Sequence, residues 1–239
     1  MPLHGVRQAE WVLVQLDGFH AVKHALRFAP RLVDAVQVAD LSAARILGEQ
    51  LAPDITDALL ALAVVADVLH PTGVCGTAQR PPEDRSVLTA RNTPLLLLDE
   101  PRHPGNAGAA IRVAAAAEAS GLALTGQLDP WHPAVVRGSA GLHFALPVLH
   151  VTPAEVTGPL LVLDADGDEL GVIPDDAVLV IGSERAGVGP ALRARADAVL
   201  RLPMRPGVSS LNLATAAAAA LYAWRLNAHL STGSHGSSR

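Results

Sequence analysis

Residues 206–224, PGVSSLNLATAAAAALYAW, place a Pro-Gly turn and several polar side chains directly before a run of alanines. Alanine has the highest helix propensity of the amino acids, so the run predicts a helix. Serine and asparagine are preferred at helix N-caps because their oxygens accept from backbone N–H groups that lack a partner within the helix. One such residue is enough for a cap, yet Ser209, Ser210 and Asn212 all stand here. Capping alone and a binding site are therefore two open interpretations of this stretch.

The composition of the chain predicts a soluble globular protein. Its 239 residues, half of them hydrophobic, are enough for one large or two modest domains. No apolar run reaches the roughly 18 to 20 residues that a membrane span requires. The first residues, MPLHGVRQAEW, lack the basic start and the apolar segment of a signal peptide. We therefore expect a cytoplasmic protein without a membrane segment.

The charged residues and the single cysteine restrict the ligands that the chain can bind. A net charge of −5 argues against a protein that coats nucleic acid nonspecifically. Lys23 is the only lysine among 18 basic residues, and arginine is the better reader of phosphates, so a local RNA site remains compatible with the total charge. Cys75 alone excludes an internal disulfide and a thiolate metal cluster, and no histidine pair has the spacing of a metal-binding helix. We expect no metal.

Short apolar runs alternate with helical patterns along most of the chain. The predicted strands cover residues 11–16, 35–38, 73–77, 94–98, 122–125, 145–150, 160–164, 177–181 and 199–204. The predicted helices include residues 18–28, 41–49, 56–69 and 108–120. This alternation is typical of parallel sheets covered by helices, so we expect an α/β fold.

One segment has the composition of a linker between domains. Residues 78–92, AQRPPEDRSVLTARN, are polar, contain two consecutive prolines and have no sustained apolar period. We expect a small α/β domain at 1–80, a linker at 81–92 and a larger domain at 93–230. The Gly/Ser-rich residues 231–239 are expected to form a flexible tail.

Three places in the larger domain combine a strand, a polar or glycine-containing loop and a helix. In LLLLDEPRHPGNAGAAIR, Asn106 and Gly108 lie at the turn, and Arg112 lies in a helix that we expect to start near Ala107. In VLVIGSERAGVGP, Gly182 and Glu184 follow the strand directly, and the opening stretch provides the third place. Because α/β sheets bind ligands at the carboxyl ends of their strands, we expect the three loops to converge on one site.

Each of these places also has a simpler interpretation when it is considered alone. Arg112 is compatible with an arginine on a solvated helix face. The glycines at 182, 187 and 189 suggest a dinucleotide-binding loop, but their spacing does not fit that motif. The combination of the three places is more specific than any one of them.

Taken together, the three places resemble the motifs of the SpoU/TrmH family of RNA ribose 2′-O-methyltransferases, which belong to the SPOUT class. The matching residues are Asn106-x-Gly108-x-x-x-Arg112, Gly182-Ser183-Glu184, and Pro203-Met204 followed by Ser210-Leu211-Asn212, within about residues 90–226. The resemblance implies a C-terminal SPOUT-type parallel sheet with a trefoil knot, a preceding small α/β substrate-binding domain and a homodimer. It also implies methyl transfer from S-adenosylmethionine to a ribose 2′-hydroxyl of ribosomal or transfer RNA, and the separate N-terminal domain favours ribosomal RNA over transfer RNA.

The same resemblance assigns roles to individual residues. It implies a catalytic group formed by Asn106, Arg112, Glu184, Ser210 and Asn212. It implies cofactor contacts from Ile181, Gly182, Leu202, Met204, Ser210 and Leu211. A guanidinium is too weak an acid to act as an ordinary base, so Arg112 is expected to stabilise developing alkoxide charge or to hold a phosphate.

The chain departs from the family at Arg185, where members usually have glycine after the glutamate. If the position requires a positive φ, an arginine would be strained there; it could instead supply an extra phosphate contact. More generally, the sequence does not decide which arginines near the motifs are paired on the surface and which bind RNA. These arginines are Arg102, Arg137, Arg185, Arg193, Arg195, Arg201 and Arg205.

Two other functions are weighed against methyl transfer. A non-catalytic RNA-binding protein that keeps the knot would be consistent with Arg185 and the acidic net charge, but it does not require all the intact motif residues. A dinucleotide-dependent oxidoreductase with a doubly wound fold would need a better glycine loop and an acidic residue about 20 positions beyond it.

Overall fold

The computed structural model describes residues 13–233 of the chain, with side chains up to residue 227. The chain forms two compact units that divide between Pro82 and Glu83, within the segment expected to be a linker. Residues just after the division pack on the second unit: Leu88 is buried in its core, and the Arg91 guanidinium donates to the carbonyl oxygen of Asp176 at 2.8 Å. The helix that ends the described part runs to Gly233, and the rest of the expected tail lies outside the described residues.

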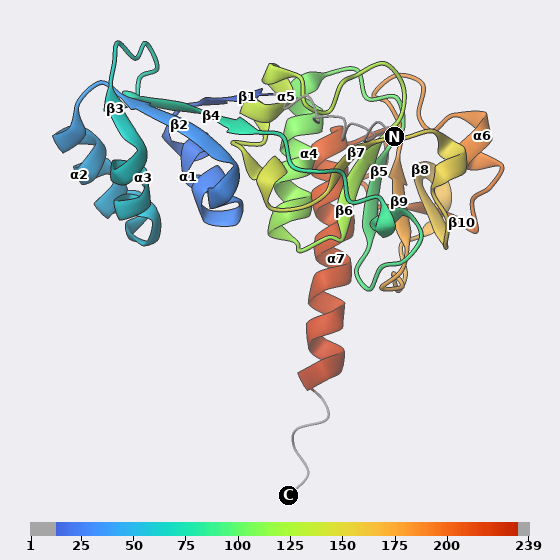
Figure 1. Cartoon of the computed structure of the whole chain (residues 1–239). Coiled ribbons are helices and arrows are strands. Elements are labelled where there is room, and N and C mark those ends of the chain that lie inside the picture. The colour runs from blue at the N-terminus through green and yellow to red at the C-terminus, as the bar shows by residue number, and fades with distance from the viewer. Residues whose placement is uncertain (1–12, 234–239) are drawn as a thin grey trace, which may run out of the picture. The chain divides into compact units, whose positions relative to one another are not determined.

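The first unit is a four-stranded sheet with helices on one face (Figure 1). Its elements are β1 (Leu13–Asp17), α1 (Phe19–Phe28), β2 (Val33–Val38), α2 (Leu41–Leu51), α3 (Thr56–Leu62), β3 (Ala63–Val65) and β4 (Val74–Gln79), with 3-10 helices at Pro30–Leu32 and Pro53–Ile55. The strand order is β1-β4-β2-β3, and only the β2–β3 pair is parallel. Buried and exposed residues alternate along β1 and β4, as expected of a sheet with one covered face.

One predicted helix of the first unit is wrong over half its length. The helix expected at 56–69 ends at Leu62, and the chain continues as β3, which pairs with β2 through Val36 and Ala63. Val64 and Val65 are β-branched, so a strand at the edge of a sheet suits them better than a helix. Tertiary pairing therefore decides this segment. Trp11 and Val12, at the start of the first predicted strand, lie outside the described residues.

The second unit contains a six-stranded sheet in which all neighbouring strands are parallel, as predicted. Its elements are β5 (Leu95–Leu98), α4 (Pro104–Ala116), β6 (Gly121–Leu124), α5 (Pro133–Gly138), β7 (Val148–His150), β8 (Leu160–Glu169), β9 (Val178–Ile181), α6 (Pro190–Arg193), β10 (Ala198–Arg201) and α7 (Leu213–Gly233), with 3-10 helices at Ser86–Leu88, Leu142–Phe144 and Pro153–Glu155. The strand order is β10-β8-β9-β5-β6-β7. The chain therefore places β9 between two strands that it has already formed.

Both faces of this sheet are covered, which explains why β5 reads as four consecutive leucines. Side chains alternate between the two faces of a strand. Leu96 and Leu98 pack with α4 and α7, whereas Leu95 and Leu97 pack on the opposite face with Val188 and Leu192. All four leucines are fully buried. A strand buried on both sides cannot show the alternation of a half-exposed strand.

Among the boundaries that differ from the prediction, three lie close to the motifs. The strand expected at 199–204 ends at Arg201, because Pro203 lacks the N–H group needed to continue a ladder. The helix expected to start near Ala107 starts at Pro104, so Asn106 lies in its first turn and not in the preceding loop. The strand expected at 160–164 extends to Glu169 as β8. The trefoil knot stays a prediction.

Candidate active site

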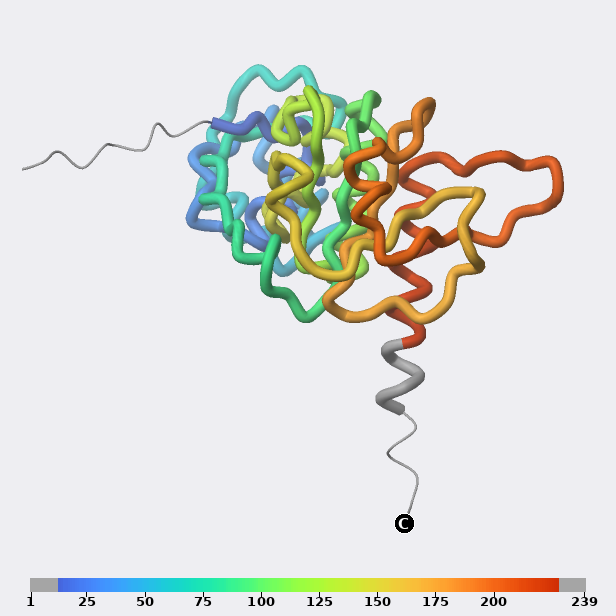
Figure 2. The backbone as a smooth tube through the Cα atoms, turned by 90° about the vertical axis from the view of Figure 1, so that its right-hand side faces the viewer, coloured from blue at the N-terminus to red at the C-terminus, as the bar shows by residue number. Residues whose placement is uncertain are grey.

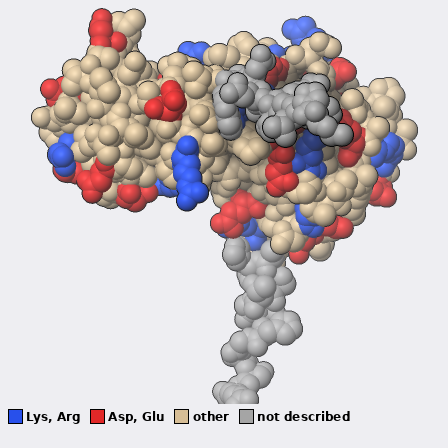
Figure 3. Space-filling view, viewed as in Figure 1, with Lys and Arg blue, Asp and Glu red and all other residues tan. Residues whose placement is uncertain are grey.

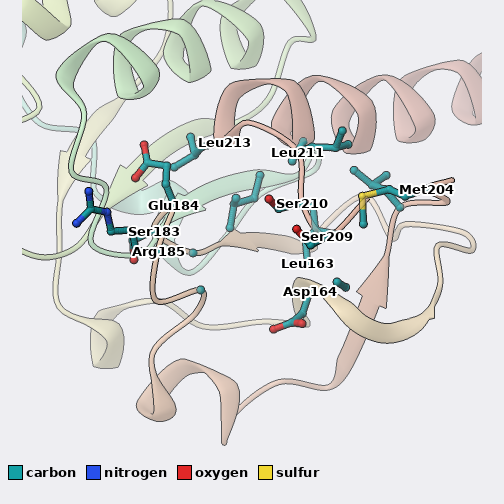
Figure 4. A pocket seen from close by; sticks show the side chains of 16 residues that line it. Leu163, Asp164, Ser183, Glu184, Arg185, Met204, Ser209, Ser210, Leu211 and Leu213 are labelled. Carbon is teal, nitrogen blue, oxygen red and sulfur yellow. The ribbon is translucent and has the colours of Figure 1, made fainter. Parts of the chain in front are cut away.

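The site lies at the carboxyl edge of the second unit's sheet. A pocket of about 370 Å³ opens where β9 and β10 end and where β8 departs from its neighbour. Its lining residues are Leu163, Asp164, Ala165, Ile181, Gly182, Ser183, Glu184, Arg185, Gly187, Leu202, Met204, Ser209, Ser210, Leu211, Leu213 and Ala216. Figure 4 shows Glu184 and Arg185 at one end of the pocket, Met204 at the other, and Ser209 and Ser210 between them. The size and the mixed lining suit a small organic ligand.

The pocket brings together every residue that the sequence assigned to cofactor binding. Ile181 and Gly182 come from the end of β9, and the others come from residues 202–212, which join β10 to α7. In Figure 2 this connection loops outward from the edge of the sheet. Apolar side chains and exposed backbone therefore meet in one cavity, although they come from separate parts of the chain.

Gly182 allows the loop after β9 to fold back tightly. Ser183 and Gly187 exchange two backbone hydrogen bonds of 3.0 Å, which brings residues 187–188 over Gly182. A Cβ atom on Gly182 would lie 1.9 Å from the carbonyl carbon of Gly187, far closer than any van der Waals contact. Gly187 itself has φ 67°, a conformation that side chains disfavour. Glycine at 182 is thus required by the shape of the loop.

The opening stretch caps α7 and also contributes to the site. The Oδ1 atom of Asn212 accepts from the backbone N–H groups of Ala214 at 2.9 Å and Thr215 at 3.4 Å. Ser209 and Ser210 line the pocket and do not cap the helix. Of the three polar residues, one satisfies the helix end and two face the cavity.

A chain of side-chain hydrogen bonds joins the three motifs. Asn212 Nδ2 donates to Asn106 Oδ1 at 3.1 Å, and Asn106 Nδ2 donates to Glu184 Oε1 at 2.6 Å. A carboxylate only accepts, so Glu184 requires the amino side of the Asn106 amide. The capping contacts of Asn212 likewise turn its amino side towards Asn106. Each group fixes the orientation of the next, from the start of α4 to the start of α7.

The surroundings of Glu184 favour its charged form. Burial raises the pKa of this carboxyl group, but the hydrogen bond from Asn106 lowers it. The backbone N–H groups of Glu184 and Arg102 and the nearby His103 also lower it, and the pKa lies below its ordinary value. Glu184 is therefore a fixed negative charge beside the pocket at neutral pH.

Arg112 does not line the pocket. It lies on α4 about two turns from the helix start, with an exposed side chain. Within the part of the chain that the structure describes, it makes no hydrogen bond or ion pair. Its guanidinium is therefore available to a bound molecule.

Arg185 is not strained. Among the described residues, those with positive φ other than glycine are Glu100, Glu118 and Ala140. The left-handed turn of this loop falls on Gly187, so the position of Arg185 accepts a side chain. Its departure from the family pattern leaves the loop geometry intact.

The sequence did not assign the pocket wall that β8 provides. The β8–β10 ladder pairs Val162 with Val199 and then Asp168 with Leu200, so residues 163–167 leave the ladder. Leu163, Asp164 and Ala165 in this excursion line the pocket. Asp164 forms an ion pair with Arg193; burial raises the Asp164 pKa, but this pair and the backbone N–H of Asp166 lower it overall. An acidic run, DADGDE, directly after an apolar strand was the available signal.

A buried carboxylate also anchors the loop after β9. Asp99, at the end of β5, accepts from the backbone N–H of Gly189 at 2.7 Å and from Thr125 Oγ1 at 2.6 Å. It is 6% exposed, and both of its carboxyl oxygens have a partner. Asp99 therefore ties the second motif to the strand that precedes the first one.

The sequence profile of the SpoU rRNA Methylase family matches residues 94–222, which contain all three motifs. The chain belongs to the SpoU rRNA methylase family. Among its relatives, the 23S rRNA (uridine(2479)-2′-O)-methyltransferase of Streptomyces viridochromogenes is 34% identical over 170 residues. That match covers 64% of this chain, and it spans only 59% of the relative.

One relative and one solved structure match almost the whole chain. The 23S rRNA (guanosine(2553)-2′-O)-methyltransferase RlmP of Bacillus subtilis is 30% identical over 222 residues, covering 87% of this chain and 86% of the relative. The crystal structure of the SpoU methyltransferase AviRb from Streptomyces viridochromogenes, in complex with the cofactor AdoMet, superposes with a TM-score of 0.74 at 27% identity. It covers 92% of this chain and 91% of that protein, so both units of the fold are shared.

The described residues contain neither a helix suited to a membrane nor a cluster suited to a metal ion. Between residues 13 and 233 no helix is both long and apolar enough to cross a membrane. Over the same residues no group of three or more His, Cys, Asp or Glu side chains is placed to hold a metal ion.

Proposed function

We propose that the chain transfers a methyl group from S-adenosylmethionine to a ribose 2′-hydroxyl of ribosomal RNA. The observation that carries this proposal is the hydrogen-bonded chain of Asn106, Glu184 and Asn212 beside the pocket. These hydrogen bonds join the three family motifs. Two 23S rRNA 2′-O-methyltransferases and a SpoU methyltransferase structure with bound AdoMet are similar to this chain.

The pocket fits the cofactor. Leu202, Met204 and Leu211 give it an apolar wall for an adenine ring, and the glycine loop exposes backbone groups for the ribose. When bound, S-adenosylmethionine supplies a methyl group on a sulfonium sulfur, and the sulfur leaves as a neutral thioether. The protein then has to position the 2′-hydroxyl and make its oxygen more nucleophilic.

Arg112 is the proposed activating residue. Its free guanidinium stabilises the negative charge that develops on the 2′-oxygen, or it holds the adjoining phosphate. Asn106, on the same helix, belongs to the rigid hydrogen-bonded chain, so α4 presents Arg112 from a fixed support. Ser210 lines the pocket and is proposed to order the third motif against cofactor and nucleotide.

Ribosomal RNA is the favoured substrate because RlmP, a relative that matches 87% of the chain, carries that activity in its name. We propose that the first unit binds the RNA, and that the second performs the transfer. A ribosomal substrate also implies the cytoplasmic location expected from the sequence.

We also propose a homodimer formed through α4 and α7. The two helices run parallel, because Asn106 contacts Asn212 near their starts and Ala117 contacts Arg225 further along (Figure 1). Both helices leave small or apolar residues exposed; these are Gly105 and Ala116 on α4 and Thr215, Ala219, Tyr222 and Leu226 on α7. Tyr222 and Leu226 are 40% and 61% exposed, which favours a covering partner. A second copy fits because the family resemblance implies a dimer.

The test is transfer of a labelled methyl group from S-adenosylmethionine to total bacterial RNA. Incorporation that survives alkali at one dinucleotide establishes ribose methylation. We expect Arg112→Ala to lower the rate at least about 100-fold, as the loss of a charge-stabilising group does, while S-adenosylmethionine binding is retained. Arg85→Ala removes an arginine that is already paired with Glu83 and Glu155, and it should leave the rate unchanged.

Two outcomes would contradict the proposal. Cofactor and RNA binding without any methyl transfer would favour the non-catalytic alternative. Loss of cofactor binding in Arg112→Ala would show that Arg112 supports the pocket and does not act on the substrate.

A further inference from the structure

The arginines around the site fall into two groups once their contacts are known. Arg193, Arg195 and Arg201 are engaged within the protein: they contact the carboxylate of Asp164, the carbonyl oxygens of Pro153 and Val156, and the carbonyl oxygen of Gly167. Arg102, Arg137, Arg185 and Arg205 have exposed side chains that make no hydrogen bond or ion pair to any residue between 13 and 233. The sequence alone could not distinguish the two groups, because arginines of both groups lie near the motifs along the chain.

The four free arginines all adjoin the motif residues. Arg185 lines the pocket next to Glu184, and Arg205 directly follows the pocket residue Met204. The backbone N–H of Arg102 donates to the Glu184 carboxylate and lowers its pKa.

Arg137 lies on α5, which packs against α4 beside the first motif. It precedes Gly138, whose backbone packs against Gly105 and Gly108 of α4, on either side of Asn106. Free positive charge thus borders the site on the side of each motif.

The face of the molecule shown in Figure 3 does not attract nucleic acid as a whole. Acidic and basic side chains are interspersed on it, and no continuous basic patch forms there. With a net charge of −5, binding of a polyanion has to rely on local cations. Arginine is suited to this because its planar guanidinium donates two parallel hydrogen bonds to a phosphate.

We propose that Arg102, Arg137, Arg185 and Arg205 hold backbone phosphates of the RNA strand on either side of the target ribose. This inference rests on the proposed function and names the residues that would bring its substrate to the pocket. Arg185, which lines the pocket, holds the phosphate nearest the target nucleotide. The engaged arginines take no part, since their donors are already used.

The test is the salt dependence of RNA binding, measured by fluorescence anisotropy with labelled poly(U) over a range of potassium chloride concentrations. Each phosphate contact to a single strand contributes about 0.7 to the slope of log K against log salt. Arg185→Gln should therefore lower the slope by about 0.7, and the combined substitution of all four by about 3. The matched control Arg85→Gln removes the same charge from an arginine paired with Glu83 and Glu155, and should leave the slope unchanged.

The results separate this inference from the proposed function. An unchanged slope in the fourfold variant overturns the inference, even if the wild-type protein methylates RNA. A reduced slope supports it, even if no methyl transfer is found. If Arg185→Gln weakens S-adenosylmethionine binding and not RNA binding, the arginine recognises the carboxylate of the cofactor, and its assignment to RNA is wrong.

Discussion

At the scale of single residues, the hydrogen bonds of the site fix the orientation of the Asn106 side chain. Both polar atoms of its amide are used: the oxygen accepts from Asn212, and the nitrogen donates to Glu184. A carboxylate at 106 could not donate, so it would place two negative charges in contact. The hydrogen bonds to Asn212 and Glu184 therefore require an amide at position 106.

The charge of Glu184 gives this network a dependence on pH. Its pKa is lower in the folded protein than in the unfolded chain, so ionised Glu184 stabilises the folded state above the ordinary carboxyl range. This contribution is lost as the pH falls through the lowered pKa. We expect the difference in free energy of unfolding between wild type and Glu184→Gln, measured with urea, to shrink below about pH 4.3. A difference that stays constant down to acid pH would contradict the assigned charge.

Gly182 offers a prediction about the pocket itself. Gly182→Ala places a methyl group 1.9 Å from the backbone of Gly187, so the loop has to move. We expect a loss of about 3 kcal/mol or more in the free energy of unfolding and a loss of S-adenosylmethionine binding. Gly171→Ala is the control, because a Cβ there meets nothing within 4 Å. Unaltered cofactor affinity in Gly182→Ala, measured by calorimetry, would show that the loop does not shape the site.

At the scale of elements, the sequence predicted the sheet of the second unit well. Leu95–Leu98 and Val178–Ile181 are buried on both faces, and such runs of leucine and valine leave few alternatives. The segment of the first unit that was mispredicted, 63–65, is a short edge strand whose local pattern continues that of α3. Its structure is decided by pairing with β2, which is distant in sequence.

Some residues of the site could be predicted from the sequence, and others could not. Those that directly follow strands, such as Gly182 and Glu184, could be placed by the rule that ligands bind at the carboxyl ends of parallel strands. The wall formed by Leu163, Asp164 and Ala165 could not, because it depends on an interruption of the β8–β10 ladder. The contacts that distinguish free from engaged arginines also lie beyond any sequence pattern.

The packing of α4 on α5 requires a small residue at 108. A Cβ on Gly108 would lie 2.5 Å from the carbonyl oxygen of Val135 and 2.7 Å from the Cα of Gly138. Gly108→Ala should therefore destabilise the protein by about 1–3 kcal/mol and reduce methyl transfer, because α4 shifts with Asn106 and Arg112.

Gly105→Ala, in the same helix, provides the matched control. A Cβ at 105 has nothing within 4 Å, and alanine favours the helix by about 0.5–1 kcal/mol over glycine. Thermal unfolding of the two variants should thus move in opposite directions. Equal effects would mean that helix propensity, and not the α4–α5 contact, governs both positions.

At the scale of the whole molecule, the proposed dimer can be tested on one exposed leucine. Leu226→Glu places a charge among the exposed residues of α7 and should convert the dimer to a monomer in sedimentation equilibrium. Leu69→Glu is the control, because Leu69 is 93% exposed and belongs to the first unit. A wild-type protein that sediments as a monomer would refute the dimer, and a dimeric Leu226→Glu would place the interface elsewhere.

The interruption of β8 has a consequence for engineering. The ladder with β10 stops after Val162 and resumes at Asp168, so the intervening residues shape the pocket without pairing with β10, although Leu163 still pairs with Ile181 of β9. Leu163 and Ala165 are therefore positions where the cavity can be enlarged or narrowed while the strand register is kept. A library confined to these two positions is the natural starting point for enzymes that accept bulkier sulfonium donors and label RNA with groups other than methyl.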